Sequence, residues 1–154
     1  MLEARRPEPE DGGRYDELFC DPVVAETLLH PPSARIFASD MVHWDRDGWG
    51  PWVWFADGGF VGRGGLMRTG VGGGDSVEVL YALLTPAHGR GLASEIALRS
   101  VACAWELGLP EVVGFARTDN RASIRVLEKA GLAYEHEIEH AGLPHWFGRV
   151  QRPE

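Results

Sequence analysis

The sequence lacks the features that mark secreted, membrane-spanning and nucleic-acid-binding proteins. It has only two cysteines, Cys20 and Cys103, and no apolar run near the ~20 residues of a membrane span. No apolar segment follows the N-terminus, so we expect no secretory signal and a cytoplasmic protein with reduced thiols. The net charge of −8 argues against a nucleic-acid-binding surface. No Cys/His cluster has zinc-site spacing, and we expect no metal.

What is present is ordinary for a globular protein. The 154 residues are 44% apolar and 25% charged, which suits a single domain over residues 1–154. No repeat, low-complexity tract or linker divides the chain. The acidic charge is compatible with a cationic substrate, although acidity most often serves solubility.

The N-terminal part predicts one short strand and three helices. The strand is expected at Leu2–Arg6 and a weak helix at Arg14–Cys20. Asp21 as N-cap and Pro22 at the first helical position open a helix over Val23–Leu29. Ser33 is expected to cap a third helix, whose apolar face carries Ile36, Phe37, Met41 and Trp44.

The middle of the chain predicts a three-strand meander. Pro51–Ala56 and Phe60–Arg68 flank the hairpin turn Asp57-Gly58-Gly59, and Ser76–Leu84 follows the glycine-rich connection Gly70–Asp75.

The last third alternates helices and strands. Helical spacing from Ala93 to Trp105 ends at Gly108, and the strand Val112–Ala116 is expected to lie parallel to Ser76–Leu84 because a helix intervenes. Asp119 or Asn120 is expected to cap a second helix that ends at Gly131. A hairpin of Leu132–His140 and His145–Val150, with Ala141–Pro144 as its turn, completes an α+β or mixed α/β domain.

The stretch between Leu84 and Ala93 is typical of a phosphate-binding loop. A buried strand leads into His88-Gly89-Arg90-Gly91, and a helix follows whose first amides have no partner within the helix. The lysine and hydroxyl of a nucleoside-triphosphate loop are missing from Gly91-Leu92-Ala93. Ser94 replaces the third glycine of a dinucleotide fingerprint, and Glu111 stands at the beginning rather than the end of the next strand.

His88-Gly89-Arg90-Gly91-Leu92-Ala93 resembles the Gln/Arg-x-x-Gly-x-Gly/Ala motif of the GCN5-related N-acetyltransferase (GNAT) superfamily, which binds acetyl-coenzyme A. A second segment, Asn120–Leu132, resembles the family's Asn-x-x-Ser/Ala…Glu-Lys-x-Gly-Phe pattern, with Leu132 in place of Phe. The strand Val77–Leu83 and the helix start Asp21–Val24 are similar to the subgroup that acetylates ribosomal-protein N-termini (RimJ/RimL type). The resemblance implies a GNAT-like fold, with a mostly antiparallel sheet that is splayed at two parallel strands and flanked by helices.

The resemblance also implies where acetyl-CoA binds. The pyrophosphate would be bound by the backbone amides of Gly89, Arg90, Gly91, Leu92 and Ala93, and the pantetheine arm by the strand backbone of Leu83, Leu84 and Thr85. Asn120 would bond the pantetheine, and Ser123 would lie near the thiol as proton donor. His88 stands where Gln or Arg is usual, and Leu127 replaces the tyrosine that many members use as general acid. Helix capping is the competing role for Asn120 and Ser123, and a solvated loop arginine for Arg90.

Acetyl transfer needs a neutral amine, and Glu78 is the preferred base. Amines are mostly protonated at neutral pH, so Glu78, or a water that it orients, would remove the proton. A structural ion pair is the competing role for this carboxylate. Trp44, Trp49 and His145 are candidates for contact with the acceptor, with core packing or surface exposure as their alternatives.

The sequence thus predicts an N-acetyltransferase that transfers directly in a ternary complex, because Cys103 lies within a helix and is not placed for an acyl relay. The partners expected are acetyl-CoA and an amine acceptor, with a homodimer possible and neither nucleic acid nor membrane involved. The alternative is an inactive acyl-CoA-binding module, a sensor or partner protein, which Leu127 and His88 keep open.

Overall fold

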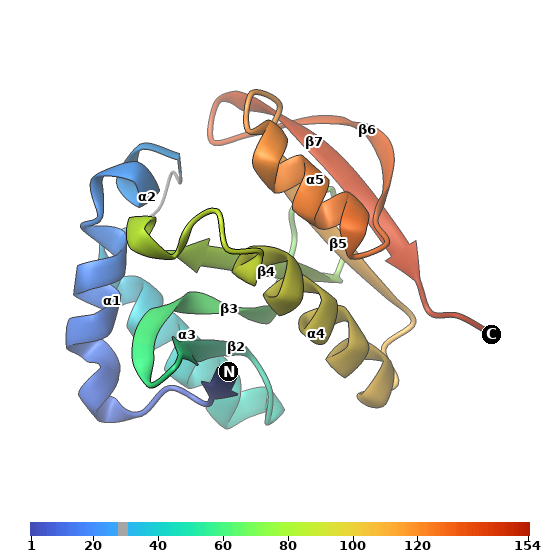
Figure 1. The fold of residues 1–154 in the computed structure, drawn as a ribbon. Helices are drawn as coiled ribbons and strands as arrows, with labels where there is room; N and C mark the ends of the chain where they lie inside the picture. The colour runs from blue at the N-terminus through green and yellow to red at the C-terminus, as the bar shows by residue number, and fades with distance from the viewer. Residues whose placement is uncertain (28–30) are drawn as a thin grey trace. The chain divides into compact units, whose positions relative to one another are not determined.

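The computed structural model describes residues 1–27 and 31–154 (Figure 1). Its strands are β1 (Leu2–Arg5), β2 (Pro51–Ala56), β3 (Gly59–Thr69), β4 (Ser76–Leu83), β5 (Glu111–Arg117), β6 (Ala133–His140) and β7 (Leu143–Gln151). Its helices are α1 (Gly12–Phe19), α2 (Pro22–Thr27), α3 (Ser33–Asp47), α4 (Leu92–Glu106) and α5 (Arg121–Lys129), and Pro9–Asp11 and Thr85–Ala87 form short 3₁₀ turns.

The described strands form one seven-stranded mixed sheet in the order β1-β2-β3-β4-β5-β7-β6. This order confirms the mixed α/β class and the neighbouring positions of β2, β3 and β4. It also shows the chain's last strand inserted between β5 and β6. No helix in the described ranges combines the length and the apolar character needed to cross a membrane.

The chain divides into two compact units. The first unit comprises Met1–Gly65 and Tyr81–Ala93, and the second comprises Leu66–Leu80 and Ser94–Glu154. Strands β3 and β4 and helix α4 each continue from one unit into the other. That residues 1–154 make a single domain remains a prediction.

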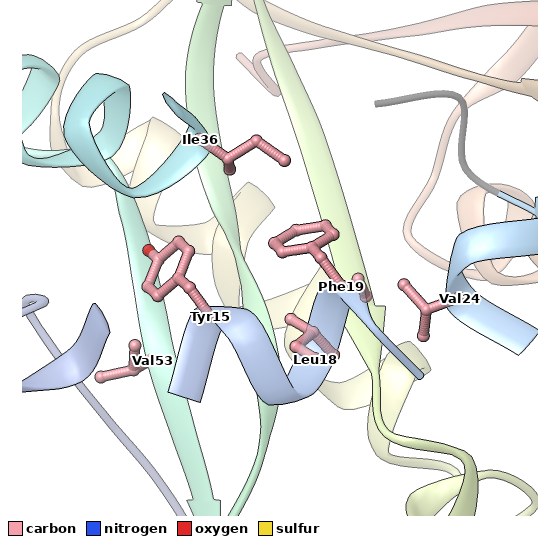
Figure 2. Packing of buried hydrophobic residues seen from close by; sticks show 7 residues of the cluster. Tyr15, Leu18, Phe19, Val24, Ile36 and Val53 are labelled. Carbon is pink, nitrogen blue, oxygen red and sulfur yellow. The ribbon is translucent and has the colours of Figure 1, made fainter. Parts of the chain in front are cut away.

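A cluster of buried hydrophobic side chains forms the core of the first unit (Figure 2). Helix α1 contributes three of them, and α2, α3, β2 and β4 contribute one each: Tyr15, Leu18, Phe19, Val24, Ile36, Val53 and Ala82. All seven are at most 8% exposed. Burial of aromatic and branched side chains at this density is the main term that stabilises the unit.

A buried ion pair lies within the first unit. Asp40 of α3 is fully buried and accepts hydrogen bonds from Arg63 Nε and Nη2, both at 2.7 Å. The Tyr15 hydroxyl donates to the same carboxylate at 2.6 Å. Burial and the Asp40 charge raise the pKa of Tyr15, so its hydroxyl keeps its proton and remains a donor.

Helix starts in the first unit show one confirmed and one wrong prediction. Asp21 caps α2, since its Oδ1 accepts the Val23 and Val24 amides at 3.0 and 3.4 Å. The predicted end of this helix at Leu28 and Leu29 lies outside the described residues. Ser33 does not cap α3: Pro32 is the N-cap, and the Ser33 hydroxyl instead donates to Asp16 of α1.

The second unit contains the parallel pair that the sequence predicts. Glu78 of β4 lies opposite Val113 of β5 in a parallel ladder. Strand β7 is antiparallel to both β5 and β6. Gly114 of β5 lies against α5, where an added Cβ would be 2.9 Å from Leu127 Cδ2.

The C-terminal hairpin turns more tightly than predicted. Ala141 and Gly142 alone connect β6 to β7, both at positive φ (51° and 78°), as a two-residue turn with matching twist requires. The predicted turn over Ala141–Pro144 is therefore too long, because Leu143 and Pro144 already belong to β7.

Candidate functional site

The loop between β4 and α4 belongs to the first unit up to Ala93. After Leu83, the 3₁₀ turn Thr85–Ala87 leads to two glycines, Gly89 and Gly91, with φ of 76° and 75°. These are left-handed conformations that glycine adopts without strain. A Cβ at either position would meet nothing within 4 Å, so the backbone of the loop is open on that side.

This geometry suits an anion. Helix α4 begins at Leu92, and its first amide N–H groups have no acceptor within the helix. The aligned peptide dipoles add partial positive charge at the same end. The predicted phosphate-loop residues from His88 to Ala93 are thus brought together on one short segment.

Three backbone groups of the predicted pantetheine-binding segment already have partners. The Leu84 amide donates to the Val61 carbonyl at 2.8 Å, and the Thr85 amide donates to Asp21 Oδ2 at 2.8 Å. The His88 ring Nε2 lies 2.8 Å from the Leu83 carbonyl oxygen. A ligand arm that paired with this strand end would share these backbone groups with their present partners.

Arg90 extends from the loop as a half-exposed side chain. Its Nη2 lies 3.9 Å from Asp57 Oδ2 in the β2–β3 turn, an ion pair between exposed groups that contributes little to stability. Arg90 is therefore available for an anionic ligand at small energetic cost.

Glu78 lies in the second unit, on β4. It is half-buried between Val77 and Val79, which are 6% and 4% exposed. Because alternate residues of a strand face opposite sides, the two valines turn away from the face that carries Glu78.

Asn120 and Ser123 meet at the start of α5 in the same unit. The Asn120 side chain accepts the Ser123 amide at 3.2 Å, so Asn120 is the N-cap. Asp119, the other predicted cap, instead pairs with Arg117 at 2.8 Å. The capping role of Asn120 is confirmed, and it leaves the amide nitrogen of its side chain for other contacts.

The two tryptophans predicted to contact the acceptor pack within the first unit. Trp44 is half-buried, and its indole N–H donates to the Pro51 carbonyl at 2.7 Å. Trp49 is 9% exposed and packs edge-on against His43, with ring centroids 4.8 Å apart. These contacts give both residues a structural role, and their contact with an acceptor remains a prediction.

His145 is 7% exposed and belongs to a ring cluster in the second unit. Its ring centroid lies 5.2 Å from that of His140 and 6.2 Å from that of Phe115, and its Nδ1 lies 3.0 Å from the Leu143 carbonyl oxygen. By register, Phe115 and His145 extend from the face of the sheet that also carries Val113 and Glu78. Desolvation, followed by the like charge of His145, lowers the pKa of His140.

The family model of the acetyltransferase (GNAT) domain matches residues 2–133. The chain belongs to this family. Its fold is also that of solved relatives of low sequence identity.

Three such structures illustrate the GNAT fold of the chain. An acetyltransferase from Agrobacterium tumefaciens is 22% identical, with a TM-score of 0.83, over 98% of this chain and 91% of that one. YncA from Salmonella typhimurium, solved with acetyl-CoA, is 19% identical (TM-score 0.78; 97% and 93% covered). The aminoglycoside acetyltransferase AAC(6')-Ib, solved with coenzyme A and kanamycin, is 16% identical (TM-score 0.80; 99% and 95% covered).

Leu127 gives this GNAT chain an apolar side chain where many relatives are expected to have a tyrosine. It is 1% exposed and packs toward Gly114 of β5. The residue therefore fills the core of the second unit.

Two features of the GNAT chain could not be recognised in the sequence. Asp21 was predicted as a helix cap and as part of the Asp21–Val24 resemblance, but nothing local indicates its bonds to Thr85, 64 residues away. The contact of Phe115 with His145 depends on the insertion of β7 between β5 and β6, which no local pattern signals. Among the described residues, no group of three or more His, Cys, Asp or Glu side chains is arranged to bind a metal ion.

Proposed function

We propose that the protein is an N-acetyltransferase that moves the acetyl group of acetyl-CoA directly to a primary amine in a ternary complex. The observation that carries this proposal is the loop from His88 to Ala93. It combines two glycines at positive φ, an open backbone and a helix start, which together suit a pyrophosphate. Membership of the GNAT family makes acetyl-CoA the compound that this loop would bind.

We assign the proposed coenzyme contacts to three segments of the chain. The amides of Gly89 to Ala93 bind the pyrophosphate, with the Arg90 guanidinium as an added cation. Backbone groups of Leu83, Leu84 and Thr85 meet the pantetheine arm, as does the Asn120 side chain. Bound acetyl-CoA supplies a thioester as the acyl donor.

The chain's own residues would then move two protons. Glu78, directly or through a water, takes a proton from the acceptor ammonium so that the nitrogen lone pair becomes available. The nitrogen then attacks the thioester carbonyl carbon, so that a C–N bond forms and the C–S bond breaks. The Ser123 hydroxyl gives a proton to the departing thiolate, and the second proton lost by the nitrogen restores that hydroxyl, directly or through water. Glu78 is half-buried on β4, and a carboxylate within hydrogen-bond reach of the ammonium, or of a water between them, can accept its proton.

The proposed acceptor is a small-molecule amine or a peptide N-terminus. A protein of the same fold, an aminoglycoside acetyltransferase, is solved in complex with coenzyme A and kanamycin. The Asp21-Pro22 helix start and Leu127 favour the subgroup that acetylates ribosomal-protein N-termini. Trp44, Trp49 and His145 are proposed acceptor contacts, and a cytoplasmic location and a homodimer remain predictions from the sequence.

Calorimetric titration with acetyl-CoA, followed by an assay for thiol release across a panel of amines, tests the proposal. We expect saturable binding and thiol release with at least one amine class. No binding at millimolar acetyl-CoA would overturn it. Binding without thiol release from any amine would instead favour an inactive acyl-CoA-binding module.

A pair of glycine variants tests the placement of the coenzyme. Gly91→Val puts a branched side chain where the pyrophosphate is proposed to lie, and it should weaken acetyl-CoA binding at least tenfold. Gly108→Val is the matched control, because Gly108 also has a positive φ (79°) and open space around its Cβ but follows α4. Equal affinities of the two variants would refute the loop placement.

A further inference from the structure

Asp21 joins two segments of the first unit that lie 64 residues apart in the sequence. Its Oδ2 accepts the Thr85 amide at 2.8 Å, and its Oδ1 accepts the Thr85 hydroxyl at 2.7 Å. Thr85 directly follows Leu84, whose amide donates a hydrogen bond to the Val61 carbonyl of β3. One carboxylate therefore receives both donors of the residue that begins the loop.

The same carboxylate caps helix α2. Oδ1 also accepts the Val23 and Val24 amides, and the Asp21 carbonyl accepts the Ala25 amide at 2.8 Å. The two Thr85 hydrogen bonds are the largest causes that lower the pKa of Asp21, so the group is ionised at neutral pH. Hydrogen bonds to a charged acceptor are stronger than those between neutral groups.

Thr85 in turn fixes the path of the loop. Its carbonyl accepts the His88 amide at 3.0 Å, and the Leu84 carbonyl accepts the Ala87 amide at 2.9 Å. Gly89 and Gly91 follow, and glycines restrict the backbone less than any other residue. The position of the loop amides therefore depends on the hydrogen-bonded turn before them, and that turn is anchored by Asp21.

We propose that Asp21 is a positioning residue for coenzyme binding, which fixes the start of the coenzyme loop through Thr85 and couples that loop to helix α2. The inference rests on the proposed function, because the loop must bind acetyl-CoA for the anchor to matter. Since linkage is reciprocal, coenzyme that orders the loop also stabilises the first turn of α2. Asp21 touches neither the acetyl group nor the acceptor in this role.

Asp21→Asn separates the anchor from the helix cap. Asparagine is as good an N-cap as aspartate, and it can keep an oxygen toward the α2 amides. Its NH₂ group then replaces Oδ2 and faces the Thr85 N–H, so a donor meets a donor. Thr85→Val is the complementary variant, because it removes the hydroxyl contact and leaves the cap of α2 intact.

We expect the Kd for coenzyme A to rise roughly tenfold in Asp21→Asn and about threefold in Thr85→Val, the range of the net contribution of one or two solvent-exposed hydrogen bonds. The KM for acetyl-CoA should rise in parallel, while kcat changes less than about twofold. Asp45→Asn is the matched control: it removes the same charge from an exposed carboxylate of the first unit that pairs with Arg6. Its Kd and KM should equal those of the wild type.

Hydrogen exchange provides the second readout. In the wild type, coenzyme A should slow exchange of the Val23–Thr27 amides, and in Asp21→Asn that protection should be reduced even at saturating ligand. Unchanged Kd values in both variants, with full protection of α2, would overturn the inference while leaving the proposed function intact. If the wild type does not bind coenzyme A, the proposed function fails and the inference fails with it.

Discussion

The Asp40 carboxylate should contribute strongly to the stability of the first unit. Its carboxylate is fully buried and accepts a bidentate pair from Arg63 and a third hydrogen bond from Tyr15. Removing one partner of a buried ion pair leaves the other charge poorly compensated, which typically costs about 3–5 kcal/mol. Asp40→Asn should therefore lower the free energy of unfolding by roughly this amount in urea titrations.

The control for Asp40 is another acid on the same helix. Asp45 is 73% exposed and pairs with Arg6, and exposed pairs contribute about 0–1 kcal/mol. Asp45→Asn should thus unfold close to the wild-type midpoint. Equal losses in the two variants would show that burial of Asp40 does not govern its contribution.

His140 should titrate below its ordinary pKa of 6.5. Desolvation is the larger cause and the nearby His145 the smaller one. In an NMR titration of the imidazole carbons, His145→Gln should move the His140 pKa upward but not fully to 6.5, because desolvation remains. A His140 pKa at or above 6.5 in the wild type would contradict the arrangement.

The lowered pKa of His140 also sets the sign of a pH effect on stability. Between the folded pKa and 6.5 the unfolded chain binds more protons than the folded one, so stability rises with pH through that window. The contribution of His140 is therefore most favourable above 6.5 and is lost as the pH falls toward the folded pKa. The difference between wild type and His140→Gln in urea titrations should change in that direction.

Single residues also show what sequence can and cannot reveal. Asn120 was predictable as a cap because the group that it caps is three residues away. Ser33 has the same chemistry next to a helix, yet its hydroxyl bonds Asp16 of another helix, so the local rule gave the wrong cap. The short-range signal fails at Ser33 because a residue of another helix takes its hydroxyl.

Strand β3 passes β4 too closely at Gly62 to carry a side chain there. A Cβ would overlap the Ala82 carbonyl oxygen and lie 2.8 Å from Leu83 Cδ2 and 3.0 Å from Leu83 Cα. Two of these atoms belong to the backbone, so the strands themselves would have to separate. Gly62→Ala should cost about 1–3 kcal/mol or more in urea unfolding, as overpacking does.

Gly59 on the same strand is the matched control. A Cβ there would lie 3.7 Å from the Ala56 carbonyl oxygen, an ordinary contact. Gly59→Ala should therefore change the free energy of unfolding by less than about 1 kcal/mol, the range of replacing a strand glycine with alanine. A comparable loss in both variants would mean that the β3–β4 approach is not the cause.

Helices, strands and the direction of strand pairing were predictable where the local sequence pattern determines them. The parallel relation of β4 and β5 followed from the helix between them, and it is confirmed at Glu78 and Val113. The tight turn at Ala141 and Gly142 was missed because Ala141 adopts a positive φ (51°), which alanine as a residue type does not indicate. Element ends thus depend on backbone conformations that side-chain types only partly indicate.

Local sequence patterns do not determine the order of the strands across the sheet. Helical and strand periodicities fixed the succession of elements, and two motifs, at His88–Ala93 and Asn120–Leu132, carried the family resemblance that the family model bears out. Neither source says that β7 lies between β5 and β6. That insertion brings Phe115 of β5 beside His145, so this neighbour was not predictable, whereas His140 lies beside His145 within the predicted hairpin.

Acetyl-CoA should raise the thermal stability of the whole protein, because a ligand that binds only the folded state shifts the unfolding equilibrium. At a concentration 100 times its Kd, the expected gain is about 2.7 kcal/mol. For a chain of this length, with roughly 2–4 °C per kcal/mol, Tm should rise by about 5–11 °C in calorimetry or a dye-based melt. Adenosine at the same concentration is the control ligand, because it lacks the pyrophosphate, and Gly91→Val is the control protein. No increase of Tm with acetyl-CoA, or an equal increase with adenosine, would contradict the proposed pyrophosphate contact at the loop from Gly89 to Ala93.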